Sequence, residues 1–270
     1  MADTETILIG TRVSFDHFLS GEDHYRFTRT LGKLERHGLS DWALAGGLAV
    51  ELHMLRLLNQ PLMRPLNDID FVARSVECLP RTLAEDFLFR HVHPRAAPGQ
   101  TILQCVDTET ALRVDVFSPC GAAMTRTSLQ RNAGLRPAEG RPEARPEACV
   151  TCNLRLISLE DLVSREASLL MDLARNAPVA RKFARDFRRL SELADPAKGE
   201  ITWPDYRKQD QPPTFVEVVQ LVRQLIDNRP DLLIVPEYST DVEATCERCQ
   251  NVPTFPLADP RFILSVLGYC

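Results

Sequence analysis

The sequence has no long apolar run and no excess of positive charge, and each absence excludes a class of protein. No apolar stretch approaches the ~18 residues that a membrane-spanning helix needs, so we expect no membrane partner. The first ten residues, MADTETILIG, contain acidic but no basic side chains, which argues against a secretory signal. We therefore expect a cytoplasmic protein.

The chain is acidic overall, but its charge is unevenly distributed. A net charge of −5 argues against a protein whose main role is to coat nucleic acid. Residues 121–190 nevertheless hold 13 Lys and Arg against 8 Asp and Glu, whereas residues 191–270 hold 7 against 13. The basic segment has two interpretations, a surface that faces a polyanion or a solvated Arg-rich helical surface. The sequence leaves both open.

Length and composition predict a hydrophobic core and more than one structural unit. The 270 residues are 44% hydrophobic and 26% charged, which is ordinary for a globular protein. We predict an α+β fold, with a small mixed-sheet core, its flanking helices and an N-terminal helix in residues 1–120. Residues 121–150 are expected to be an Arg- and Pro-rich linker, and residues 151–270 a mainly helical C-terminal lobe.

Hydrophobic periodicity and capping residues predict the individual elements. The expected helices span residues 22–37, 48–58, 80–88, 158–175, 178–193 and 214–227. Strands are expected over residues 41–45, around Asp68 and Asp70, and over residues 101–106, 111–117 and 153–157. The strands at 101–106 and 111–117 should form a hairpin, because only a short polar turn separates them. The tail after residue 230 is not assigned.

Eight cysteines in a cytoplasmic chain are not expected to form disulfides. Four of them form two C-x-x-C pairs, Cys149 with Cys152 and Cys246 with Cys249, a spacing typical of structural Zn²⁺ sites. The long separation of the pairs and the lack of flanking glycines argue against such a site. A zinc site and isolated thiols both remain possible interpretations.

Gly46 and Gly47 lie between a strand-like segment and a helix-like one. Glycines let the backbone approach an anion closely, and the following helix N-terminus offers N–H groups and the positive end of its dipole. The pair therefore predicts a phosphate-binding turn.

Three aspartates in strand-like segments suggest a metal site. The two-residue period of a strand places Asp68 and Asp70 on one face, about 7 Å apart, where their charges repel unless a cation such as Mg²⁺ lies between them. Asp115 shares a strand face with Arg113, opposite three aliphatic residues. Asp115 is either a third ligand or part of the exposed face of an edge strand, and its low β-propensity favours a functional reason.

In their order and spacing these residues resemble the nucleotidyltransferase superfamily that includes DNA polymerase beta, and most closely its AbiEii-like toxin branch. The residues that carry the resemblance are Gly46, Gly47, Ala49, His53, Arg64, Asp68, Asp70 and Asp115. The resemblance implies an enzyme that moves a nucleoside monophosphate from an NTP to an acceptor hydroxyl. It covers residues 40–117, with weaker similarity to about residue 195.

The resemblance also assigns roles. Two Mg²⁺ ions would be held by Asp68, Asp70 and Asp115, with the NTP phosphates on Gly46, Gly47 and Arg64. In the toxin branch a Lys and a Lys-Asp pair in later helices assist, and the corresponding nucleotide-binding residues here would be Arg165, Lys182 and Asp186. Arg165 departs from the pattern by replacing a Lys, and Leu48 departs by replacing a Ser found in many relatives.

The acceptor stays open among RNA, such as a tRNA 3′ end, a protein and a small molecule. The resemblance further suggests the toxin of a toxin–antitoxin system, with a cognate antitoxin as partner. The alternative function is a catalytically inactive binding module of the same fold that contains a structural zinc ion.

Overall fold

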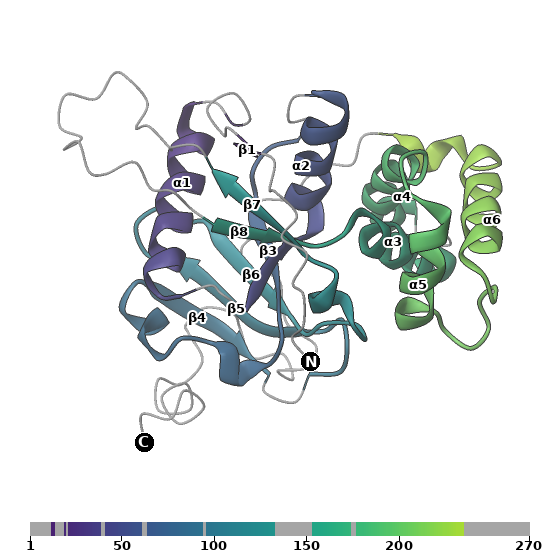
Figure 1. Cartoon of the computed structure of the whole chain (residues 1–270). Helices are drawn as coiled ribbons and strands as arrows, with labels where there is room; N and C mark the ends of the chain where they lie inside the picture. The colour runs from purple at the N-terminus through teal and green to yellow at the C-terminus, as the bar shows by residue number, and fades with distance from the viewer. Residues whose placement is uncertain are drawn as a thin grey trace.

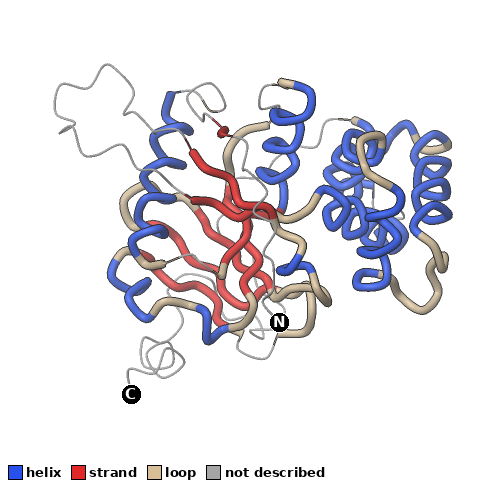
Figure 2. The backbone as a smooth tube through the Cα atoms, in the orientation of Figure 1, coloured by secondary structure: helices blue, strands red, loops and turns tan. Residues whose placement is uncertain are grey.

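The computed structural model describes residues 12–13, 19, 21–38, 41–60, 64–93, 96–132, 153–173 and 177–234. These residues form an α+β fold, in which a mixed sheet lies beside a layer of helices (Figure 1; Figure 2).

The sheet contains eight strands in the order β1-β7-β8-β2-β3-β6-β5-β4. They are β1 (Arg12–Val13), β2 (Trp42–Ala45), β3 (Asp68–Ala73), β4 (Phe87–Val92), β5 (Thr101–Asp107), β6 (Arg113–Phe117), β7 (Ser128–Asn132) and β8 (Asn153–Leu156). β3 and β6 are parallel neighbours, while β2 and β5 flank them as antiparallel partners. The mixed sheet and the hairpin of β5 and β6 are therefore confirmed.

Within the described residues, six α-helices and four short 3₁₀-helices accompany the sheet. The α-helices are α1 (Gly21–Arg36), α2 (Gly46–Leu58), α3 (Leu159–Leu173), α4 (Ala177–Ser191), α5 (Pro196–Tyr206) and α6 (Phe215–Asp227). The 3₁₀-helices are η1 (Val76–Cys78), η2 (Arg81–Glu85), η3 (Ala123–Thr125) and η4 (Pro230–Leu233). Five of the six predicted helices are confirmed within two residues at each end.

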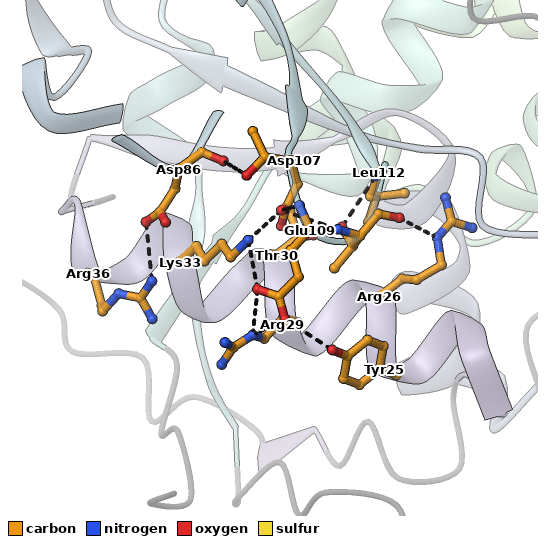
Figure 3. Close-up of polar contacts among 12 residues, drawn as sticks. Tyr25, Arg26, Arg29, Thr30, Lys33, Arg36, Asp86, Asp107, Glu109 and Leu112 are labelled. Carbon is orange, nitrogen blue, oxygen red and sulfur yellow. Dashed lines mark hydrogen bonds and ion pairs between the residues drawn. The ribbon is translucent and has the colours of Figure 1, made fainter. Parts of the chain in front are cut away.

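A buried ion pair holds α1 against the turn between β5 and β6 (Figure 3). Lys33 Nζ lies 2.5 Å from Asp107 Oδ1, and Thr30 Oγ1 donates to Asp107 Oδ2 at 2.7 Å. Glu109, within the turn, pairs with Lys33 and accepts a hydrogen bond from Arg29. Burial alone would raise the pKa of the Asp107 carboxyl. The hydrogen bonds from Lys33 and Thr30 outweigh this effect, so the pKa lies below its ordinary value. The turn before β6 is thus fixed to the helix.

Helices α3 to α6 pack together in a bundle beside the sheet, and α2 joins this bundle to the sheet (Figure 1). We call α3 to α6 the helical layer. α2 contacts β2 and β3 on one side and α3 and α4 on the other. Phe187, Trp203 and Phe215 supply large buried side chains within the helical layer. The described helices include none with the length and apolar character required to cross a membrane.

The predicted helix over residues 80–88 is wrong beyond one short turn. Arg81–Glu85 forms η2, and β4 begins at Phe87. Phe87 and Phe89 are buried whereas Leu88 is exposed. The two-residue alternation of a strand therefore places both phenylalanine side chains on the buried face. In a helix, side chains two positions apart would point in different directions.

Helix α5 was not expected from the sequence, because Gly199 and Pro204 lie inside it and lower helix propensity. Asp195 caps its start by accepting a hydrogen bond from Ala197 N at 3.0 Å. Gly199 allows close packing, since a Cβ atom there would lie 2.2 Å from the ring of Phe215. Packing against α6 therefore determines a helix that local propensity disfavours.

The sheet extends beyond the predicted boundary at residue 120. Ser128–Asn132, within the expected linker, forms β7. Asn153–Leu156, assigned to the helical lobe, forms β8 and pairs with both β7 and β2. The strongly Arg- and Pro-rich composition of residues 136–148 concealed β7, whereas the strand expected over residues 153–157 is confirmed as β8. The possible zinc ligands, Cys149, Cys152, Cys246 and Cys249, lie outside the described residues.

Candidate functional site

Parallel pairing of β3 with β6 brings the three predicted aspartates together. The register places Asp68 beside Arg113 and Asp70 beside Asp115. On the opposite face Ile69 is fully buried in the core, as strand alternation requires. Ligand oxygens of the three aspartates lie within 4.8 Å of one another. We call Asp68, Asp70 and Asp115 the carboxylate triad.

The interpretation of Asp115 as part of an exposed edge is wrong. β6 lies between β3 and β5 in the sheet, and Asp115 is buried. Its Oδ1 atom is buried and has no hydrogen-bond partner in the part of the chain that the structure describes. A buried carboxylate oxygen without a donor is costly unless a cation or a ligand satisfies it.

The triad concentrates negative charge. Burial, together with the neighbouring charges of Asp68 and Asp115, raises the pKa of Asp70 to about 7, and the charges of Lys182 and Arg165 act in the opposite direction. Burial also raises the pKa of Asp115. Three clustered carboxylates repel one another and can hold a divalent cation between them, and hard oxygen donors of this kind suit Mg²⁺.

The glycine pair lies directly against the triad and its neighbourhood. Gly46 has φ +60, and a Cβ atom there would lie 1.8 Å from Asp70 Oδ2. At Gly47 a Cβ atom would lie 2.6 Å from Arg64 Nη1. α2 begins at Gly46, two residues earlier than predicted, and its N-cap residue Ala45 provides no side-chain hydrogen bond. The first backbone amides of α2 therefore lie next to Asp70 of the triad, and no side chain of the N-cap residue hydrogen-bonds to them.

Arg64 belongs to a buried ion-pair network that was not among the predictions from the sequence. Its Nε donates to Glu51 Oε1 at 3.0 Å, and its Nη2 donates to Asp186 Oδ1. Glu51 also accepts from Arg189, at 2.6 and 3.1 Å. Burial alone would raise the pKa of Glu51. The hydrogen bonds and positive charges of Arg189 and Arg64 outweigh this effect, so the pKa lies below its ordinary value. The network joins α2 to α4, and an acid on the buried face of α2 was its signal in the sequence.

His53, another residue of the resemblance, also joins two elements. It is buried in α2, and its Nε2 lies 2.9 Å from the carbonyl oxygen of Ile157, which lies between β8 and α3. Burial lowers the pKa of His53 to about 4, so the ring is neutral and Nε2–H donates this bond.

Arg165 and Lys182 bring positive charge from the helical layer toward the triad. The charges of both side chains lower the pKa of Asp70. Arg165 lies over the ring of Phe117 at 5.9 Å and pairs with Glu166 at 3.3 Å. Burial raises the pKa of Glu166, a residue absent from the sequence-based expectations, to about 8. The charges of both expected cations thus act on the triad, whereas Asp186 holds Arg64.

A pocket of about 990 Å³, including its open mouth, lies between the sheet and the helical layer. Asp70 and Gly46 form part of its wall on the sheet side, together with Phe117. Arg165, Leu169 and Tyr206 line it from α3 and α5. Its lining is mostly apolar, which is typical of a site that takes up a small organic group beside a few polar contacts.

A second ion-pair network fixes the loop after β6 at the edge of this pocket. Arg126 pairs with Asp161 at 2.5 Å and with Asp205 at 2.7 Å. Gly121 has φ +47, and a Cβ atom there would lie 1.9 Å from Asp205 Oδ1. Tyr206 donates to Asp161 at 3.1 Å. The sheet and the helical layer are therefore tied together on this side as well.

Comparison with protein-family models finds no match, and comparison with curated proteins also finds none. Among solved structures the chain is similar to an antigenic nucleotidyltransferase-like protein from Paracoccidioides brasiliensis. The two share 17% sequence identity over 79% of this chain and 92% of that chain, with a TM-score of 0.43. The likeness is distant, and no residue of the site is assigned from it.

Proposed function

We propose that this protein is a Mg²⁺-dependent nucleotidyltransferase, which moves a nucleoside monophosphate from an NTP to an acceptor hydroxyl. The observation that supports it best is the carboxylate triad, whose ligand oxygens lie within 4.8 Å of one another beside a glycine-initiated helix. The mostly apolar pocket that includes Asp70 and Gly46 in its wall adds room for a nucleotide.

Asp68, Asp70 and Asp115 would hold the metal. Their fit rests on three carboxylate side chains in one cluster and on the buried Asp115 Oδ1, which lacks a hydrogen-bond partner among the described residues. When bound there, two Mg²⁺ ions would activate the attacking hydroxyl and neutralise charge on the phosphates and the pyrophosphate leaving group.

The remaining nucleotide contacts come from α2 and the helical layer. The first amides of α2, at Gly46 and Gly47, would receive phosphate oxygens at the positive end of the helix dipole. Arg165 and Lys182 would balance the phosphate charge, and the apolar pocket would take the base. Because Arg64 is held by Glu51 and Asp186, we assign it a positioning role behind Gly47.

The transfer itself is an in-line substitution at the α-phosphorus. The acceptor oxygen forms a new bond to that phosphorus, and the bond from the α-phosphorus to the oxygen bridging to the β-phosphorus breaks, so pyrophosphate leaves. Asp115 would accept the proton of the acceptor hydroxyl on a carboxylate oxygen. The acceptor itself, whether RNA, protein or small molecule, and a toxin role with a cognate antitoxin are further parts of the proposal that the site geometry leaves open.

The test is incubation of the full chain with each of four α-labelled NTPs, Mg²⁺ and a cell lysate. The RNA, protein and small-molecule fractions are then separated and counted. We expect label in one fraction, and its loss in Asp68→Asn, Asp70→Asn and Asp115→Asn. Asp210→Asn, in an exposed turn, is the matched control and should keep full labelling.

Circular dichroism of each variant would show that the fold persists. Equal labelling by the wild type and all three triad variants would refute the proposal, and so would the absence of label from every fraction. The second outcome would favour a binding module with this fold over an enzyme.

A further inference from the structure

Arg113 lies inside the carboxylate triad as a fourth member of the same face. The parallel register places it directly beside Asp68, and the strand period places it two residues before Asp115. Asp68, Asp70, Arg113 and Asp115 therefore form a block of two residues on each of two adjacent strands.

The guanidinium of Arg113 bridges the first and third carboxylates. Its Nη2 donates to Asp68 Oδ2, and its Nε forms an ion pair with Asp115 Oδ2 at 3.2 Å that is not a hydrogen bond. The three side chains are between 10% and 25% exposed, so water screens these contacts only in part. Two oxygens that could bind a divalent cation are thus occupied by a cation of the chain itself.

The charges of this block limit what else it can bind. When all three carboxylates are ionised, their negative charges and the positive charge of Arg113 sum to −2. A single divalent cation would neutralise this net charge. In the described part of the chain, the oxygens left for a cation are then those of Asp70, Asp68 Oδ1 and Asp115 Oδ1, the last of which has no hydrogen-bond partner there. A second divalent cation would need the position between Asp68 and Asp115, which the positively charged guanidinium of Arg113 already occupies.

We propose that Arg113 is a displaceable counter-ion, which competes with a divalent cation for Asp68 and Asp115. The nucleotide-free protein then binds one divalent cation, and full loading of the triad requires Arg113 to leave these carboxylates. The inference rests on the proposed metal-dependent transfer. Arg113 is then a positioning residue, because its release from Asp68 and Asp115 determines when the triad can bind its full set of metal ions.

The test is Mn²⁺ binding to the full chain without nucleotide, followed by the electron paramagnetic resonance signal of free Mn²⁺. We expect one Mn²⁺ per wild-type chain. In Arg113→Gln we expect two, with the affinity for the first raised by about tenfold or more, because a unit positive charge beside the ligands is removed. Arg74→Gln, at an exposed position after β3, is the control and should bind as the wild type does.

A second variant covers failure of Arg113→Gln to fold. Arg113→Lys keeps the charge but has a single ammonium group, which cannot bridge both carboxylates as the guanidinium fork does. We expect its Mn²⁺ affinity to lie above that of the wild type and below that of Arg113→Gln. Nucleotidyl transfer by Arg113→Gln should also reach half its maximal rate at a lower Mg²⁺ concentration than transfer by the wild type.

Two negative outcomes are distinguishable. If the wild type binds Mn²⁺ and transfers nucleotide while neither variant binds more tightly, Arg113 is no competitor and only this inference is refuted. If no protein binds Mn²⁺ and no label is transferred, the proposed function is refuted together with the inference.

Discussion

The carboxylate of Asp70 occupies the space that a Cβ atom on Gly46 would fill, because such an atom would lie 1.8 Å from Asp70 Oδ2. The glycine turn and the D-x-D strand are therefore one structural unit. β2 and β3 pair with Ala45 opposite Asp70, so the end of β2 delivers the start of α2 to the acidic strand. A phosphate at the helix start would lie next to the metal ligands.

Gly46→Ala should abolish nucleotidyl transfer. The φ of +60 costs an alanine about 1–3 kcal/mol, and the new methyl group must also displace the Asp70 carboxylate. The free energy of unfolding, from urea denaturation, and the transfer rate test this expectation.

Gly38→Ala is the matched control for backbone strain. Gly38 has φ +84, but nothing lies within 4 Å of its Cβ position. Gly38→Ala should lower stability by about 1 kcal/mol and keep transfer activity. Equal activity of Gly46→Ala and Gly38→Ala would contradict the link between Gly46 and Asp70.

Glu51→Gln should destabilise the protein strongly. The side chain of Glu51 is fully buried, and its loss of charge would leave the guanidinium groups of Arg64 and Arg189 without their shared carboxylate. Removal of one partner from a buried ion pair costs about 3–5 kcal/mol. Chemical denaturation would measure the loss, and transfer should also fall because α4 carries Lys182.

The control for this prediction is an exposed ion pair between α4 and α6. Arg188 and Asp227 pair at 3.2 Å, with side chains 50% and 66% exposed. Asp227→Asn should therefore change the free energy of unfolding by about 0–1 kcal/mol. A loss from Glu51→Gln no larger than this would show that the buried network contributes little.

The triad could be predicted from the sequence because the face of a strand on which each aspartate lies depends only on neighbouring residues. Asp68 and Asp70 share a face through the strand period alone, and Asp115 follows the same rule in the next apolar strand. The sequence indicated that these strands exist, and sheet pairing then brought the faces together. The helix starts and the glycine pair are local signals of the same kind.

The networks that hold the site could not be predicted in this way. Glu51 and Arg189 are separated by 138 positions, and their contact depends on how the helical layer packs against α2. β7 is short and lies before a segment of Arg- and Pro-rich composition, so neither local propensity nor periodicity predicts it. β8 is predicted as a strand, but its pairing with β7 and β2 depends on tertiary structure.

Stability should depend on pH through Asp107. Its pKa is lowered in the folded protein, so the stabilisation that it provides is present above the unfolded value of about 3.9 and is lost as pH falls through the folded pKa. Asp107→Asn removes this contribution. The difference in unfolding free energy between the wild type and Asp107→Asn should therefore be largest near neutral pH and shrink in acid below about pH 4. A difference that stays constant from neutral pH into acid would contradict this role of Asp107.

Filling the pocket between the sheet and the helical layer should weaken nucleotide binding and leave the chemistry intact. Leu169 lines the pocket from α3 and is only half-buried, so Leu169→Trp adds volume on the pocket side and need not disturb the core. We expect KM for the NTP to rise about tenfold, which corresponds to about 1.4 kcal/mol of lost binding, with kcat nearly unchanged. Leu221→Trp, at an exposed position on α6, should leave both constants unchanged. A fall in kcat at constant KM would instead place the reacting groups, and not the base, against α3.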